Sequence, residues 1–137
     1  GKTYDMVRAT KGHKYFRILK KLLYPGGIKT YRRVMLDKLT PEGIAYWYQD
    51  DGSLKRNTNK EGKVTSINAT ISTYCSEEEA NIVCEYFLDY CGIDFRTKYH
   101  KHTDKYYVSV RTSEAKKLFK LILPYIHESM MYKIDLV

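Results

Sequence analysis

The stretch Leu39-Thr40-Pro41-Glu42-Gly43-Ile44-Ala45-Tyr46-Trp47-Tyr48-Gln49-Asp50-Asp51-Gly52 decides how the rest of the chain is interpreted. Thr40 is a good N-cap residue and Pro41 fits the first position of a helix. The residues from Ile44 to Tyr48 are apolar or aromatic on nearly all sides, which is typical of a helix buried from several directions. Gly52 can end that helix. We therefore predict a buried helix that ends in two adjacent carboxylates.

Alternating and helical patterns follow this helix. Polar and basic residues occupy 53–59, a turn is expected at 60–62, and residues 64–73 alternate as in a half-buried strand. A capping box begins at Ser76, and the helix that it starts closes at Gly92. Two more strands are expected at 94–100 and 106–111. Ser113 is expected to cap a last helix, which Pro124 interrupts before a short helical segment runs on to Lys133.

The predicted order is helix, two strands, helix, two strands, helix. This order predicts an α+β domain in which helices pack on one face of a four-stranded antiparallel sheet. Before the first helix, residues 3–9 are strand-like, residues around 14–23 are an amphipathic helix, and residues 29–38 are expected to form a basic connector.

The charge balance favours a polyanionic partner. The chain has 137 residues with 24 Lys and Arg against 16 Asp and Glu, a formal net charge of +8. Three cysteines without a CxxC pair are expected to be buried thiols in a reducing compartment rather than zinc ligands. No apolar run reaches the length of a membrane span and no signal peptide is present, so we expect a cytoplasmic protein, or one of an organelle matrix if an organelle encodes it.

The run from Leu39 to Gly52 resembles the LAGLIDADG motif of homing endonucleases. It has the form LTP-x-x-x-A-x-W-x-x-D-D-G, which is common in the second half of organellar-type enzymes and in related intron maturases. The end of the chain is also similar to this family, with Pro124-Tyr125-Ile126 followed by Met130-Met131-Tyr132-Lys133. The resemblance covers essentially the whole chain and implies the LAGLIDADG fold, in which the sheet forms a DNA-binding saddle.

The resemblance also implies a catalytic site. Two motif helices pack side by side in this family, and each delivers one acid to the centre of the saddle. Here Asp51 takes the role of the catalytic, metal-binding acid, and the backbone carbonyl of Asp50 is a further Mg²⁺ ligand. Lys133 is expected to stabilise the developing negative charge, and Lys29 occupies the matching position of a partial repeat. The residues expected at the helix-pair interface are Ile44, Ala45, Trp47 and Tyr48.

Strand alternation predicts a polar and basic sheet face, and the resemblance implies that this face lies along the major groove of double-stranded DNA, which is wide enough for a β-ribbon. The residues expected to contact DNA are Ser53, Lys55, Arg56, Asn57, Lys63, Ser66, Asn68, Thr70, Ser72, Arg96, Lys98, His100, Tyr107, Ser109 and Arg111.

A strand, an amphipathic helix, a proline and a lysine follow one another at the start of the chain and again at its end, which is a weak signal of an internal repeat. It predicts that residues 1–38 are the C-terminal remnant of a preceding repeat and that residues 39–137 are one LAGLIDADG repeat. The second motif helix is then expected from a missing N-terminal repeat or from another copy of the chain. The lack of an initial methionine favours a fragment.

Two other functions share this fold and charge. One is an intron RNA maturase, and the other is a non-catalytic DNA-binding module derived from an endonuclease. A role at a membrane surface is disfavoured, because the basic residues interleave with strand patterns instead of lining one amphipathic helix.

Overall fold

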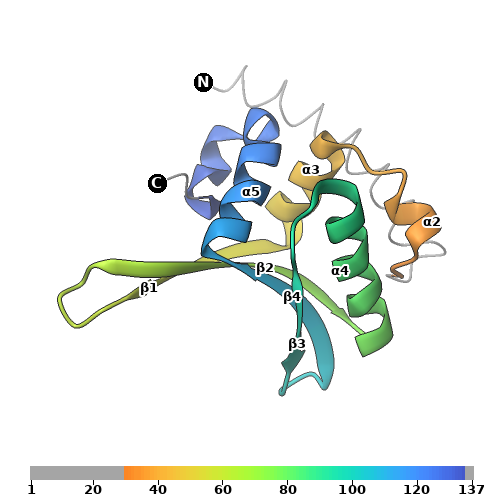
Figure 1. Cartoon of the computed structure of the whole chain (residues 1–137), viewed down its shortest axis with the longest axis horizontal. Coiled ribbons are helices and arrows are strands. Elements are labelled where there is room, and N and C mark those ends of the chain that lie inside the picture. Colours follow the sequence, from red (N-terminus) through yellow and green to blue (C-terminus); the bar gives the residue numbers. More distant parts are fainter. Residues whose placement is uncertain (1–29, 135–137) are drawn as a thin grey trace.

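The computed structural model describes residues 30–134, in which helices cover one face of a four-stranded sheet (Figure 1). The elements are α2 (Arg33–Leu36), α3 (Pro41–Asp51), β1 (Gly52–Thr58), β2 (Val64–Cys75), α4 (Glu77–Cys91), β3 (Arg96–His100), β4 (Lys105–Arg111), α5 (Thr112–Ile122), and the 3-10 turns η2 (Leu123–Tyr125) and η3 (Glu128–Lys133). The predicted α+β class is confirmed.

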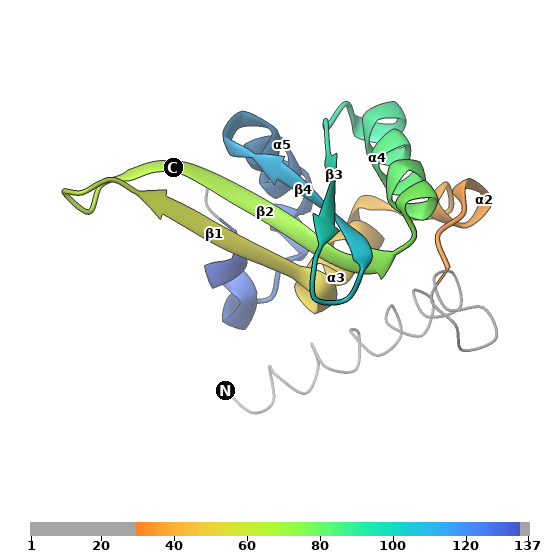
Figure 2. The same cartoon turned by 90° about the horizontal axis from the view of Figure 1, so that it is seen from below.

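The sheet has the strand order β1-β2-β4-β3, and every neighbouring pair is antiparallel. Residues 64–71 of the long strand β2 pair with β1, and residues 68–75 pair with β4 on its other edge. Figure 2 shows the hairpin of β1 and β2 extending beyond the body of the molecule. The turn of this hairpin is fixed by Asn59, whose side-chain oxygen accepts from the backbone N–H groups of Glu61 and Lys63 at 2.9 and 3.0 Å.

The helix starts and stops follow local chemistry. The hydroxyl of Thr40 accepts from the backbone N–H of Gly43 at 3.2 Å, and Ser76 does the same for Glu79 at 3.1 Å. Gly92 adopts a left-handed conformation with φ of 68°, which glycine tolerates best, and its N–H bonds to the carbonyl of Leu88 at 3.0 Å.

One core lies between the helices and the covered face of the sheet. Ile67, Ala69 and Ile71 of β2 point into it, as the alternation predicts. Trp47 of α3 stacks between Tyr31 and Phe87, with ring centroids 5.8 and 5.7 Å apart. Within residues 30–134, no helix combines the length and the apolar character that a membrane crossing requires.

Two local predictions were wrong. The basic connector contains the helical turn α2, which packs on α4 because Arg33 bonds to Glu85 and Asp89 at 3.0 and 2.8 Å. Helix α5 begins at Thr112 with Arg111 at its N-cap, so Ser113 lies inside the helix and does not cap it. The strand and helix predicted before residue 30 lie outside the described residues.

Candidate active site and nucleic-acid interface

The acid pair of the motif lies where α3 turns directly into β1. Asp51 is the last residue of α3 and is partly exposed, Asp50 is exposed, and Gly52 is the first residue of β1. Gly52 has an ordinary extended conformation with φ of −87°, so no special backbone angle requires glycine here. A Cβ atom at this position would lie 2.3 Å from the backbone oxygen and from a ring carbon of Tyr48. Glycine is therefore needed for space.

We expect Gly52→Ala to destabilise the fold by about 1–3 kcal/mol, because the helix end or the start of β1 must move. Chemical denaturation measures this change. Gly43→Ala, also on α3, is the matched control, since the atoms nearest its added Cβ would be those of the Leu39 and Thr40 side chains, at 3.2 and 3.7 Å. If the two variants unfold at the same denaturant concentration, the steric account of Gly52 is wrong.

The structure brings Lys133 to the end of α3. Its ammonium donates to the backbone carbonyl of Gln49 at 2.7 Å, two residues before Asp51. The hydroxyl of Tyr48 in turn donates to the backbone carbonyl of Lys133 at 2.6 Å. The predicted acid and the predicted lysine, 82 positions apart in sequence, thus belong to one local cluster. Lys29 lies outside the described residues.

The predicted helix-pair interface is corrected by the structure. Ile44, Ala45, Trp47 and Tyr48 are each 0% exposed, because they face the core of their own chain. Tyr48 packs on Phe119 of α5, with ring centroids 5.9 Å apart. These side chains therefore offer no surface to a second helix.

The more accessible side of α3 carries other residues. Gly43 and Tyr46 are partly exposed and Asp50 is exposed. The spacing of three and then four residues places all three on one side of the helix. This side of α3, rather than the core-facing one, is the candidate surface for a second motif helix.

The face of the sheet opposite the helices collects most of the predicted DNA-binding residues into cross-strand rows. One row joins Lys55, Asn68 and Arg111 across β1, β2 and β4. The next row joins Ser53, Thr70, Ser109 and Arg96 across all four strands. Beyond these rows, Lys98 pairs with Tyr107 and His100 with Lys105. Basic groups therefore alternate with small hydrogen-bonding groups across this face.

Several of these polar side chains bond to one another. The hydroxyls of Ser53 and Thr70 are 2.6 Å apart, and the amide of Asn57 donates to the hydroxyl of Ser66 at 3.0 Å. Such bonds hold the side chains in fixed rotamers before any ligand arrives. Ser109 is only 7% exposed in the middle of its row, so it presents little surface for a base contact.

Two of the predicted contact residues do not lie on this face. Arg56 pairs with Ile67, whose side chain points into the core, so the alternation of β1 turns Arg56 toward the helix side. Its grouping with Lys55 and Asn57 was wrong for that reason. Lys63 lies between the hairpin turn and β2, outside the strands. Ser72 lies in the part of β2 where the pairing with β4 is irregular.

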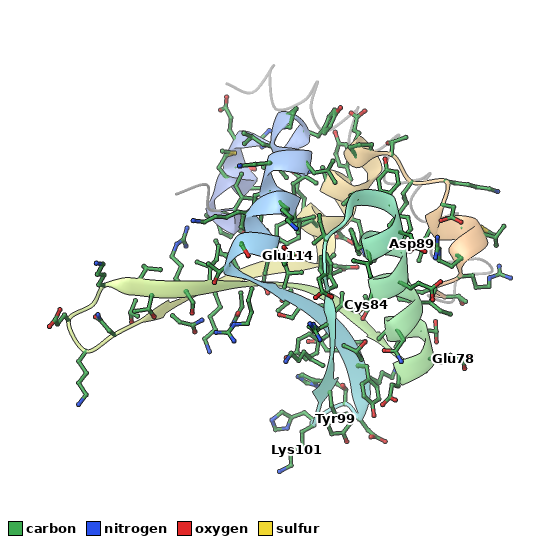
Figure 3. All side chains as sticks on the ribbon, in the orientation of Figure 1. Glu78, Cys84, Asp89, Tyr99, Lys101 and Glu114 are labelled. Carbon is green, nitrogen blue, oxygen red and sulfur yellow. The ribbon has the colours of Figure 1, made fainter. Side chains whose placement is uncertain are left out.

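At the far end of the sheet, rings gather around His100. Tyr74, His102 and Tyr107 have ring centroids 5.1, 5.8 and 6.4 Å from that of His100. Figure 3 shows Tyr99 and Lys101 at the β3–β4 hairpin, at the end of the sheet that lies away from Glu114. This end adds aromatic and basic side chains to the polar face.

Sequence reasoning missed the roles of Tyr48 and Gln49. Gln49 is 7% exposed, and its amide accepts from the backbone N–H of His127 at 2.8 Å. The one available signal was a polar amide within an otherwise apolar helix, since such a group needs hydrogen-bond partners when it is buried. Two of its partners, the backbones of Tyr125 and His127, are 76 and 78 positions away, which no local pattern reveals.

The family model of the LAGLIDADG DNA endonuclease family matches residues 3–118. The chain belongs to this family. A relative described as a probable intron-encoded DNA endonuclease 3, from Mycosarcoma maydis, is 35% identical over 91% of this chain and 89% of its own length. An uncharacterized protein of Methanocaldococcus jannaschii is 27% identical over 93% of this chain and 47% of its own length.

The LAGLIDADG fold is confirmed by a solved structure of the homing endonuclease I-WcaI bound to its DNA recognition sequence. The two share a TM-score of 0.65 at 24% sequence identity, over 80% of this chain and 47% of the solved one. The chain thus spans about half of this LAGLIDADG protein and of the archaeal relative, and nearly all of the fungal one.

Proposed function

We propose that this LAGLIDADG chain is a unit of a site-specific endonuclease that binds double-stranded DNA on its open sheet face and hydrolyses phosphodiesters at the end of α3. The observation that carries the proposal is the position of Lys133, whose ammonium bonds to the helix turn that ends in Asp51. An acid and a cation brought together at a helix end, beside a basic sheet face, suit hydrolysis of a phosphodiester. Family membership and the resemblance to a DNA-bound homing endonuclease support the same function.

Oxygen donors at the end of α3 fit Mg²⁺, which takes carboxylate, carbonyl, phosphate and water oxygens. The carboxylate of Asp51 and the backbone carbonyl of Asp50 would hold it. The metal would lower the pKa of a bound water and neutralise charge on the scissile phosphate. Asp51 holds its carboxylate at the helix end, and Lys133 supplies positive charge where negative charge develops.

We propose further that the site is completed by a second motif helix. Within residues 30–134, no group of three His, Cys, Asp or Glu side chains gathers as a metal site would require. The described residues hold one motif helix with one catalytic acid, Asp51, and we expect the other acid from another copy or from a preceding repeat. The side of α3 with Gly43, Tyr46 and Asp50 is the proposed contact surface.

The boundary at residue 38 stays a proposal, with residues 1–38 as the remnant of a preceding repeat. Residues of this stretch pack on the unit that follows it: the N–H of Tyr31 bonds to Glu79 at 3.0 Å, and Arg33 bonds to α4. A remnant of this kind would therefore be held by the repeat as part of its core.

The sheet face gives a direct test of DNA binding. We expect Lys98→Ala and Arg111→Ala each to weaken binding to duplex DNA at low salt and to lower the salt slope of log Kd by about 1, because one phosphate contact is lost. Titrations of labelled duplex at several salt concentrations measure both values. Lys120→Ala is the matched control, since this exposed lysine lies on α5, away from the sheet. Equal slopes for Lys98→Ala, Arg111→Ala and Lys120→Ala would contradict the assignment of the face.

The catalytic half of the proposal is tested by Mg²⁺-dependent cutting of duplex DNA and by its loss in Asp51→Asn. Cutting that needs no divalent cation, or that survives this substitution, would contradict it.

A further inference from the structure

Two adjacent residues of the last turn of α3 hold the end of the chain in place. Residues 125–133, here called the C-terminal segment, meet the motif helix through Tyr48 and Gln49. The amide nitrogen of Gln49 donates to the backbone carbonyls of Ala45 at 3.2 Å and of Tyr125 at 3.4 Å. Its amide oxygen accepts from the N–H of His127 at 2.8 Å. The first part of the C-terminal segment is thus fixed on both sides of Ile126.

Tyr48 fixes the other end of the segment. Its hydroxyl lies 2.6 Å from the carbonyl oxygen of Lys133 and 3.2 Å from that of Ser53, the residue after Gly52. A tyrosine hydroxyl carries its proton at neutral pH and has one O–H group to donate to these carbonyls. One hydroxyl therefore links the motif helix, the start of β1 and the backbone of Lys133.

Outside these bonds, the C-terminal segment is held by a few packed side chains, with Tyr125 and Met130 partly buried against the core. It contains the last residue of the 3-10 turn η2 and the whole of η3, and neither turn contains a buried residue. Ile126 and Ile134 are buried beside them, but each anchors only one point. At Lys133 itself, the backbone carbonyl is bonded to Tyr48 and the ammonium to the carbonyl of Gln49, so both bonds of this residue lead to the last turn of α3.

We propose that Tyr48 and Gln49 are positioning residues that set the place of Lys133 relative to Asp51, which makes the C-terminal segment a functional part of the active site. This inference rests on the proposed roles of Asp51 and Lys133. Catalytic groups on separate segments must be held to a fraction of an ångström, because a shift of about 1 Å can cost about a hundredfold in rate. Tyr48 and Gln49 couple the two segments through buried side chains, which limits the competition of solvent for their bonds.

The test substitution is Tyr48→Phe, which deletes the hydroxyl and keeps the ring that packs on Phe119. We expect the rate of Mg²⁺-dependent cleavage at saturating DNA to fall by about 10- to 100-fold. The affinity for duplex DNA should stay unchanged, since the hydroxyl is buried and contacts Ser53 only at its backbone carbonyl. Tyr86→Phe is the matched control: Tyr86 is also 0% exposed, and its hydroxyl has no hydrogen-bond partner among the described residues.

A double-mutant cycle separates positioning from general stability. If Tyr48 acts through Lys133, Tyr48→Phe should lower the rate in the parent chain and cause no further loss when Lys133→Ala is already present. Hydrogen exchange gives a readout that needs no cleavage. Amides of residues 126–134 should exchange faster in Tyr48→Phe than in Tyr86→Phe, while those of β2 and β4 stay protected.

Three results would overturn the inference: a cleavage rate for Tyr48→Phe equal to that of Tyr86→Phe, an equal loss in both backgrounds of the cycle, or unchanged exchange in residues 126–134. Failure of the proposed function is seen separately, through cleavage that persists in Asp51→Asn. Loss of cleavage in Asp51→Asn together with a normal rate in Tyr48→Phe would refute the positioning role alone.

Discussion

Asp51→Asn is expected to abolish Mg²⁺-dependent cleavage, with a loss of about a thousandfold or more, while duplex DNA binds as well as before or more tightly. The amide keeps the size of the side chain but removes the negative charge that a divalent cation requires. Loss of one group that stabilises charge in a transition state typically costs about 10²–10³ in rate, and loss of the metal costs more. Removing a negative charge near the phosphates also lowers repulsion, which favours binding.

Single-turnover cleavage rates and equilibrium titrations with duplex DNA measure the two effects independently. Asp50→Asn is the matched control, because the proposed metal ligand at this position is the backbone carbonyl, which the substitution leaves in place. We expect a much smaller loss in Asp50→Asn than in Asp51→Asn. Cleavage that survives Asp51→Asn, or equal losses in the two variants, would remove Asp51 from the active site.

Trp47→Ala is expected to have the largest effect on stability, a loss of about 3–5 kcal/mol in the free energy of unfolding. Trp47 is 0% exposed and stacks between Tyr31 and Phe87. Its indole N–H has no hydrogen-bond partner among the described residues, so the side chain acts by packing alone. Because small domains have a net stability of about 5–15 kcal/mol, a cavity of this size would leave the chain close to unfolding.

Urea denaturation followed by circular dichroism measures this loss. Leu88→Ala is the control, because Leu88 lies on α4, the helix that also carries Phe87, and is 53% exposed. Substitutions at exposed positions usually change stability by about 0.5 kcal/mol or less. If Trp47→Ala is as stable as Leu88→Ala, Trp47 is not a core residue. A surface role, such as the helix-pair interface predicted from the sequence, would then have to be reconsidered.

The sequence predicted the architecture because its signals are local. Strand alternation placed Ile67, Ala69 and Ile71 on the covered face, and the caps at Thr40 and Ser76 are those observed. The short turn α2 was missed because Arg33 is held by carboxylates of α4 more than 50 positions away. Ser113 was taken as a cap because capping chemistry alone does not show that Arg111 ends β4 directly before the helix.

Residues of the site could be predicted only where the family motif or the alternation of a strand indicates them. Asp51 and Lys133 came from the family resemblance, and the structure brings them to one helix end. The interface residues were assigned to the wrong side of α3, because a helix that is apolar all round does not reveal which side its own chain covers. Arg56 was assigned to the wrong face of the sheet because its neighbours in sequence are all polar. Such a run does not show which residues of β1 face the helices and which face away from them.

The central claim is that a sheet face reads duplex DNA while Asp51 at the end of α3 cuts it. Incubation of the chain with a randomised duplex library and Mg²⁺, at protein concentrations that favour pairing of two copies, followed by sequencing of all new DNA ends, tests this most directly. We expect ends that recur at one related set of sequences and vanish in Asp51→Asn. A chain that is folded, paired and bound to the library, yet yields no recurring ends, would contradict the claim and leave a nucleic-acid-binding module that does not cut DNA.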